Sequence, residues 1–224
     1  QGNLPLAPWE EFKHDESARE GLSHARIDRT AGASSLFRYH DLQHLPLNIA
    51  KGKPYELDTL FLYFTNPLYS LPDREAWLAA LDHIPYIVSF SPFMDETTLH
   101  ADLVLPDCTY LERWRSDDVT YLAGITLFGV GEPVVAPVYD TRQTEDVILY
   151  LARHLGVHMA SALPWENYQA VLYDKARGLY ESGRGHIVMP QQEEAFEDIL
   201  LRQGFWRRKF DSYEDFWKEL LRKG

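Results

Sequence analysis

Short apolar runs and one helical repeat alternate in the second quarter of the chain. Residues 57–64 form an apolar run of strand length, which ends because the residue before Pro67 is pushed out of the helical region. Residues 73–82 carry large apolar side chains at helical spacing, behind a proline and beside acidic residues that suit a first helical turn. Residues 86–90 form a second apolar run, rich in β-forming residues, and a shorter third run ends at Pro106. The pattern predicts a strand, a helix, a strand and a short apolar segment, in that order.

Two apolar strands joined by a helix form a βαβ unit, which predicts an α/β fold with a parallel sheet. In such sheets ligands bind beyond the carboxyl ends of the strands. Thr65, Asn66 and Pro67 follow the first predicted strand, and Ser89 and Ser91 lie at the end of the second. Most of these side chains are short and polar, so they allow the backbone to approach an anion closely. The sequence therefore predicts a ligand site at this edge of the sheet.

Four motifs in the same part of the chain resemble one protein family. The order and spacing of the last three make the resemblance specific, and it covers about residues 54–156. The motifs are Thr65-Asn66-Pro67, Phe93-Met94-Asp95-Glu96-Thr97, Ala101-Asp102-Leu103-Val104-Leu105-Pro106 and Tyr110-Leu111-Glu112-Arg113. The chain resembles the molybdopterin oxidoreductases, or dimethyl sulfoxide reductase superfamily. It is most similar to the large subunits of polysulfide reductase, the quinone reductase complex and alternative complex III.

The resemblance implies a cofactor and a set of residues that bind it. In this family a molybdenum or tungsten centre is held by two molybdopterin guanine dinucleotides, and a Rossmann-like α/β domain cradles one dinucleotide at its strand ends. Family members often place an aspartate that binds guanine where this chain has Ser91, so guanine recognition departs from the family pattern here. The metal ligand comes from an upstream segment in the family, and no catalytic or metal-binding residue is assigned in this chain. The cofactor-binding residues implied by the resemblance are Thr65, Asn66, Pro67, Ser89, Ser91 and Thr97.

The resemblance also implies the setting in which the chain works. We expect an internal portion or subunit of an oxidoreductase of anaerobic respiration, inactive alone, in a quinone-linked membrane complex with iron–sulfur and membrane-anchor subunits. The periplasmic face of a bacterial membrane is the expected location, with the cytoplasm as the alternative. Some relatives keep the fold without a working metal, so a non-catalytic scaffold subunit is the alternative function.

Charge and cysteine content narrow the remaining possibilities. The formal net charge is −12, which argues against a nucleic-acid partner because such a partner requires a basic face. Cys108 is the single cysteine, whereas an iron–sulfur cluster takes about four thiolates, so no cluster is expected within these residues. No apolar run approaches the length of a membrane span.

The rest of the chain predicts three parts. Residues 1–53 read as an irregular N-terminal cover segment, residues 54–160 as the α/β portion that binds the molybdopterin dinucleotide, and residues 161–224 as a helical extension packed on it. Residues 116–141 read as turn-rich, with three glycines and two prolines. The predicted helices outside the α/β unit cover residues 142–155, 164–182, 192–202 and 212–221.

Three other interpretations are weaker. His40 and His44 have the spacing of zinc ligands on a helix, but the glutamate of the HExxH pattern is missing, and a structural role is favoured. Glu96 and Asp102 suggest the acid pair of a hydrolase, but no nucleophile or oxyanion donor accompanies them, so a cofactor-loop or structural role is favoured. An unrelated nucleotide-binding protein is disfavoured, because neither glycine-rich phosphate motif follows a strand.

Overall fold

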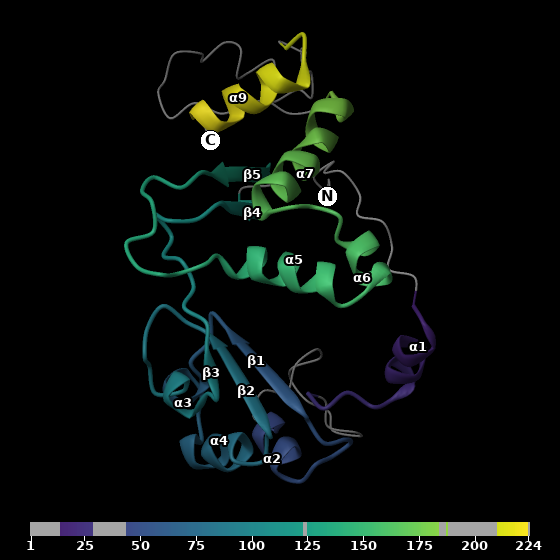
Figure 1. Ribbon diagram of the computed structural model, residues 1–224, viewed down its shortest axis with the longest axis vertical. Coiled ribbons are helices and arrows are strands. Elements are labelled where there is room, and N and C mark those ends of the chain that lie inside the picture. The colour runs from purple at the N-terminus through teal and green to yellow at the C-terminus, as the bar shows by residue number, and fades with distance from the viewer. Residues whose placement is uncertain (1–13, 29–43, 123–124, 184–186, 188–209, 224) are drawn as a thin grey trace. The chain divides into compact units, whose positions relative to one another are not determined.

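The computed structural model describes residues 14–28, 44–122, 125–183, 187 and 210–223 (Figure 1). The contacts divide these residues into two compact units. One, which we call the sheet unit, holds the described residues up to 107 together with 139–142. The other, the hairpin unit, holds residues 108–138 and the described residues from 143 onward. The domain limits predicted at residues 53 and 160 stay a prediction.

The sheet unit is built on three parallel strands. They are β1 (Thr59–Tyr63), β2 (Tyr86–Phe90) and the short β3 (Leu103–Val104), in the order β1-β2-β3. Thr59 pairs with Tyr86, and the register continues to Tyr63 opposite Phe90, so β1 and β2 end at the same level. The prediction of two parallel strands is confirmed, and the third apolar segment forms the third strand.

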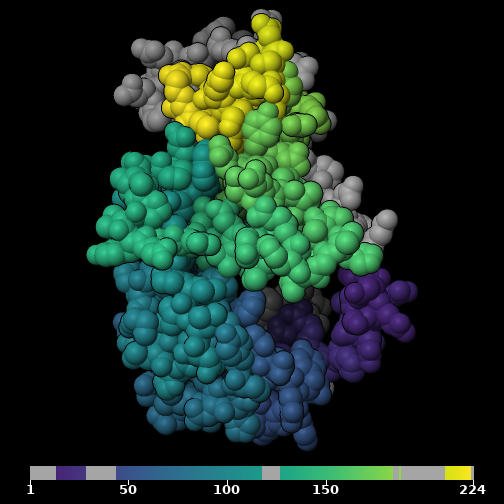
Figure 2. All heavy atoms as spheres, viewed as in Figure 1, coloured from purple at the N-terminus to yellow at the C-terminus, as the bar shows by residue number. Residues whose placement is uncertain are grey.

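Helices α2 (Leu45–Ala50), α3 (Pro67–Ser70) and α4 (Arg74–Leu81) supply the core of the sheet unit. The crossover predicted at residues 73–82 is α4. Its buried side chains pack with Leu62 and Ile87 from one face of the sheet. In Figure 2 the blue to teal atoms of this unit form one closely packed body. The buried residues of this core are Ile49, Leu62, Leu68, Trp77, Ala80, Leu81, Ile84 and Ile87.

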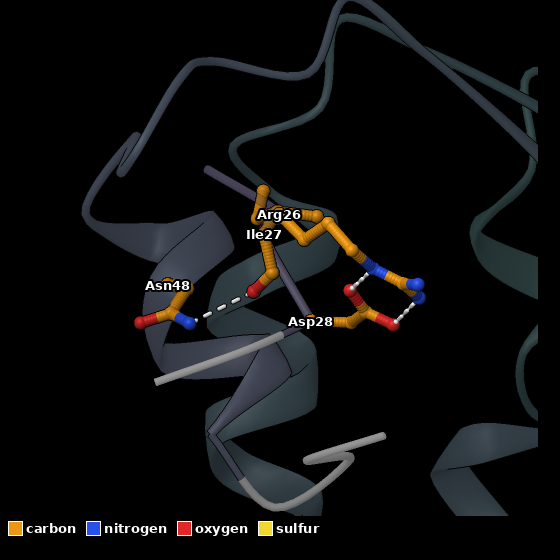
Figure 3. Close-up of polar contacts among 4 residues, drawn as sticks. All are labelled: Arg26, Ile27, Asp28 and Asn48. Atoms are coloured by element: carbon orange, nitrogen blue, oxygen red, sulfur yellow. Dashed lines mark hydrogen bonds and ion pairs between the residues drawn. The ribbon is translucent and has the colours of Figure 1, made fainter. Parts of the chain in front are cut away.

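The N-terminal part of the sheet unit attaches to α2 through a side chain. After α1 (Glu16–Ser23) the chain reaches Ile27, whose carbonyl accepts a hydrogen bond of 2.8 Å from the Asn48 amide (Figure 3). Arg26 and Asp28 on either side form an ion pair, in which Arg26 Nε donates to Asp28 Oδ1 at 2.7 Å. Burial of Ile27 against the core and the Asn48 bond together hold this segment in place.

The start of α4 combines a cap with a strained backbone. Asp73 has φ 62° and ψ 63°, the left-handed region that non-glycine residues rarely adopt. Its carboxylate accepts a hydrogen bond of 3.1 Å from the N–H of Ala76 and so satisfies one donor of the first turn. Aspartate suits both demands, because its short polar side chain tolerates the left-handed region better than most.

We expect Asp73→Ala to destabilise the protein by about 2 kcal/mol, because it removes the cap and places alanine in a left-handed conformation. Asp73→Asn keeps an acceptor and tolerates the conformation, so its effect should stay within about 0.5 kcal/mol. Urea denaturation followed by circular dichroism measures both. Equal losses in the two variants would contradict this account of the cap.

The hairpin unit begins with two antiparallel strands that the sequence did not predict. Strands β4 (Arg115–Leu122) and β5 (Ile125–Gly131) pair from Arg115 opposite Gly131 onward, so the turn-rich interpretation of residues 116–141 was wrong over most of its length. Two of the three glycines that suggested turns, Gly129 and Gly131, lie within β5, and Gly124 lies outside the described residues. A Cβ at Gly131 would lie 2.6 Å from Arg115 Nε, so glycine lets the arginine side chain cross the hairpin.

Among the described residues after the hairpin, the helices are α5 (Thr144–His154), α6 (Val157–Ala162), α7 (Tyr168–Ser182) and α9 (Tyr213–Lys223). The helices predicted at residues 142–155, 164–182 and 212–221 correspond to α5, α7 and α9. Gly183, with φ 59°, follows the last residue of α7 and caps it, and Ser212 and Asp215 form a reciprocal cap at the start of α9. A core rich in aromatic side chains joins β5, α7 and α9, and its buried members are Val130, Leu172, Ala176, Tyr213, Phe216, Trp217 and Leu220.

Two predictions concern residues outside the described part of the chain. The helix predicted at residues 192–202 lies there, and so does His40, one member of the suggested histidine pair. Among the residues that the structure does describe, no helix has the length and apolar character needed to cross a bilayer.

Glu112 connects two loops of the hairpin unit. Its carboxylate accepts hydrogen bonds of 2.9 Å from the Thr109 N–H, the Thr109 hydroxyl and the Val138 N–H. The backbone N–H groups of Val138 and Thr109, followed by the Thr109 hydroxyl, lower the pKa of Glu112. The ionised form is therefore the one that the fold stabilises.

The lowered pKa of Glu112 predicts a pH dependence of stability. Because its folded-state pKa lies below the unfolded value of about 4.3, its contribution is present above that pH and is lost as the pH falls through the folded pKa. Glu112→Gln should therefore lower the urea midpoint at pH 7, and the difference from wild type should shrink below about pH 4. Glu132→Gln, at an exposed position of the same unit, is the control. A constant difference from pH 7 to pH 3 would refute the assignment.

Candidate functional site

Two loops meet at the carboxyl edge of the sheet unit. Residues 64–67 follow β1 and residues 91–97 follow β2, and we call them the edge loops. Since Tyr63 pairs with Phe90, the two strands stop at the same level and the loops leave the sheet side by side. This is the edge at which parallel α/β sheets bind their ligands.

The Asn66 side chain joins the two edge loops. Its Nδ2 donates to Glu96 Oε2 at 2.8 Å, and its Oδ1 accepts from the Thr97 hydroxyl at 2.6 Å. The same hydroxyl accepts from the backbone N–H of Leu68 at 3.1 Å. Thr97 is 1% exposed, so the two bonds of its hydroxyl are largely shielded from water, whereas the bond between Asn66 and Glu96 is exposed. Asn66 and Thr97 therefore position the loops from within.

The serine of the second edge loop and the serine near the end of β2 also form hydrogen bonds within the protein. Ser91 Oγ donates to the Phe93 carbonyl at 2.8 Å and accepts from the Phe93 N–H at 3.2 Å, which closes a tight turn. Ser89 is buried, and its hydroxyl lies 2.9 Å from that of Thr98 at the start of η1 (Thr98–His100). Asp95 Oδ1 accepts from the Thr98 N–H at 2.8 Å and orders the same turn.

All six residues predicted to bind the cofactor lie at this edge, but they differ in accessibility. Thr65 is exposed, Ser91 is half-buried, and Pro67 is buried at the start of α3. Ser89 and Thr97 face the interior. Of the six, Thr65 is the residue most open to a ligand. The role of the whole set in binding stays a prediction.

The two acids considered as a hydrolase pair have separate structural partners. Asp102 Oδ2 accepts from the Ile87 N–H at 2.7 Å, and its own N–H donates to the Ile87 carbonyl, so Asp102 extends the sheet at the amino-terminal end of β3. Glu96 lies in the edge loop after the carboxyl end of β2, where the hydrogen bond from Asn66, followed by that from its own N–H, lowers its pKa. These contacts support the structural interpretation.

The sequence analysis assigned no binding role to the apolar side chains of the edge loops, although Phe93 and Met94 belong to one of the family motifs. Phe64, Phe93 and Met94 are 76%, 70% and 62% exposed. Phe64 has φ 52°, a conformation that costs a phenylalanine about 1–3 kcal/mol. The exposure of Phe64 has no signal in the sequence, since an aromatic residue directly after a strand normally reads as part of the apolar run.

The similarity to known proteins agrees with this arrangement. The profile of the molybdopterin oxidoreductase family matches residues 21–154, more than half of the chain. The chain belongs to this family. Its match begins in the N-terminal segment and includes both edge loops.

Several relatives are molybdopterin proteins by name. The molybdopterin-binding-like subunit of menaquinone reductase from Nitratidesulfovibrio vulgaris is 34% identical over 51% of this chain and 16% of its own length. The molybdopterin-containing subunit of arsenate respiratory reductase from a Shewanella species is 25% identical over 79% of this chain and 20% of its own. The chain thus spans about a fifth or less of the length of these relatives.

One solved structure shares the fold. Acetylene hydratase from Pelobacter acetylenicus superposes with a TM-score of 0.50 and 23% identity, over 61% of this chain and 18% of that protein. The matched part of this chain therefore has the same fold as a part of that protein.

The edge loops suit the nucleoside end of a dinucleotide. They offer exposed apolar side chains, an exposed threonine and short turns, and these features fit a planar base and a ribose. Metal binding is a different matter: in the described ranges no three His, Cys, Asp or Glu side chains gather as a metal site would require. The residues of the edge loops therefore suit the organic part of the family cofactor and not its metal.

We expect Thr97→Val to destabilise the protein by about 1–3 kcal/mol, because the buried Leu68 N–H and the side-chain oxygen of Asn66 lose their partner. Thr65→Val is the matched control at an exposed position, and its effect should stay within about 0.5 kcal/mol. Chemical unfolding of both variants measures the difference. Similar effects in the two would mean that the Thr97 hydroxyl does not hold the loops.

Proposed function

We propose that this chain is the portion of a molybdopterin-dependent oxidoreductase that binds one molybdopterin guanine dinucleotide at the edge loops. The observation that carries the proposal is the meeting of two short loops at the carboxyl edge of a parallel sheet, within the stretch that matches the family. This is a Rossmann-like use of the sheet, in which the ligand lies across adjacent strand ends.

The residues of the chain have two tasks in this proposal. Thr65 and the turn closed by Ser91 contact the nucleotide, while Asn66, Ser89 and Thr97 fix the loops that present them. Pro67 starts α3 and directs the first loop away from the sheet. The cofactor, with its molybdenum or tungsten, supplies the redox chemistry when it is bound.

The proposed setting is a respiratory, quinone-linked complex at a membrane, on its periplasmic face. Support comes from the menaquinone reductase subunit, which is 34% identical to this chain over the matched region. The partners are the remaining parts of the molybdoenzyme together with iron–sulfur and membrane-anchor subunits. Since the chain corresponds to about a fifth or less of its relatives, it has no redox activity alone in this proposal.

A non-catalytic scaffold subunit is the second candidate. Two observations favour it: the relative just named is called molybdopterin-binding-like, and Ser91 stands where the family often has a guanine-binding aspartate. The Ser91 hydroxyl is occupied by its own turn. In a scaffold the edge loops serve assembly alone.

Cofactor analysis of the complete protein separates the two functions. If the chain binds the cofactor, the purified protein contains pterin, detected by fluorescence after oxidation, together with molybdenum or tungsten and a guanine nucleotide released by acid. If the protein is folded and its purified complex lacks all three, the chain has the scaffold function.

Within the binding function, we expect Asn66→Leu to reduce the bound pterin strongly and to lower stability modestly. The leucine removes both hydrogen bonds that join the edge loops. Asn48→Leu is the matched control. It removes the hydrogen bond of 2.8 Å from the Asn48 side-chain amide in α2 to the Ile27 carbonyl, which lies outside the edge loops. It should lose stability but keep its pterin. Full pterin content in the Asn66 variant would refute the assignment of the site.

A further inference from the structure

One loop of the hairpin unit exposes a run of apolar side chains. Residues 133–138, which we call the apolar loop, follow β5 and contain no charged residue. Val134, Val135 and Val138 are 69%, 47% and 74% exposed. Single exposed valines are ordinary, whereas a run of exposed apolar residues in a loop marks a functional surface.

Hydrogen bonds fix the apolar loop on its own unit. The N–H groups of Val134 and Val135 both donate to the Leu111 carbonyl, at 2.8 and 3.2 Å, and the Val138 N–H donates to the Glu112 carboxylate. The two prolines of the loop restrict its backbone further. A surface that is already held in one conformation loses little entropy on binding, so the loop is preorganised for contact.

The segment that holds the apolar loop is also exposed and apolar. Leu111, whose carbonyl accepts the two bonds from the loop, and Tyr110 before it are both exposed. The Tyr110 carbonyl accepts a hydrogen bond of 3.0 Å from Arg115 Nη1, so this segment is tied to β4. Residues 110–111 and the apolar loop are therefore connected, and we call them together the apolar surface.

The size of the apolar surface indicates an occupant that is joined covalently to this chain. A stable interface between separate proteins uses about 20–30 residues from each side. Residues 110–111 and 133–138 provide far fewer. A tethered segment can bind through such a small surface, because the tether keeps its effective concentration high.

Charge and length agree with a tethered occupant. The formal net charge of −12 makes two copies of this chain repel each other, which disfavours a second copy. The chain covers 16% of the menaquinone reductase subunit and 20% of the arsenate reductase subunit, so most of each relative lies outside the matched stretch. A longer polypeptide of this kind has ample length to supply the covering segment.

We infer that the apolar surface is the docking site of another segment of the same polypeptide in the complete protein, one that presents uncharged apolar side chains. The inference rests on the part of the proposed function that makes this chain a portion of a longer protein. It assigns an interface to residues other than the edge loops.

The accessibility of the apolar loop in the complete protein tests the inference. Val138→Cys keeps the N–H that donates to Glu112, and its reaction with a maleimide is followed by mass spectrometry of the labelled peptide. If a segment covers the loop, labelling should be about tenfold slower than in Glu166→Cys, an exposed polar position of the same unit, because it then requires local opening. Equal labelling rates in the two variants overturn the inference.

A charged variant tests whether apolar contact causes the protection. Val134→Asp, added to the Val138→Cys protein, places a carboxylate in the interface and should restore fast labelling. Circular dichroism checks that this protein is folded. Slow labelling that the added charge leaves unchanged also overturns the inference.

Photo-crosslinking identifies the occupant. In the complete protein p-benzoylphenylalanine replaces Tyr110, whose side chain is exposed, and the irradiated protein is separated by mass and digested. Adducts of monomer mass with a peptide outside residues 1–224 of the same polypeptide support the inference. Adducts between two copies or with another subunit, adducts confined to residues 1–224, or no adducts overturn it.

The pterin content of the same samples separates this inference from the proposed function. Complete wild-type protein without pterin refutes the cofactor function, whichever labelling rate is measured. Protein that contains pterin and is labelled rapidly at Val138→Cys refutes the docking site alone.

Discussion

The candidate site depends on one buried hydroxyl group, that of Thr97. It donates to Asn66 and accepts from the Leu68 N–H, so it links segments about thirty residues apart in the sequence. Parallel strands need such a link, because no hairpin turn fixes the ends of neighbouring strands relative to each other. Water cannot replace the bond where the side chain is buried. The start of α3 and the orientation of Glu96 both follow from this single contact.

In the hairpin unit too, side chains form hydrogen bonds that a neighbouring strand would otherwise supply. Gln143 precedes α5, and its amide both donates to the Trp114 carbonyl at 2.9 Å and accepts from the Trp114 N–H at 3.1 Å. The pair reproduces the two bonds that a neighbouring strand would make at this position. Glu112 serves the loops that flank the hairpin in a comparable way. In each unit, polar side chains continue the hydrogen bonding of the backbone where regular structure ends.

The sequence correctly predicted elements that depend on neighbouring residues. It missed contacts between residues that are far apart in the sequence. Strands β1 and β2 and helix α4 appear as apolar runs and a helical repeat, so their order and parallel pairing were predicted correctly. The hairpin was missed because Gly131 reads as a turn residue. Glycine is needed there because the Arg115 side chain of the opposite strand occupies the space of a Cβ.

The same limit applies to the candidate site. Its position at the strand ends was predicted, because it depends only on the end of each apolar run. The bridge from Asn66 to Glu96 was not, since it joins residues thirty positions apart. For the same reason the sequence alone does not distinguish Ser89, which is buried, from Thr65, which is exposed.

The backbone of Phe64 has a consequence for the evolution and engineering of this protein. A glycine at φ 52° carries no steric penalty, so a library screened only for heat resistance favours its replacement. Such a screen rewards removal of an aromatic ring that contributes little to the core, since three quarters of its surface is exposed. Such a replacement would change the exposed surface of the first edge loop, so a stabilisation campaign that aims to leave the candidate site unaltered should keep residue 64 fixed.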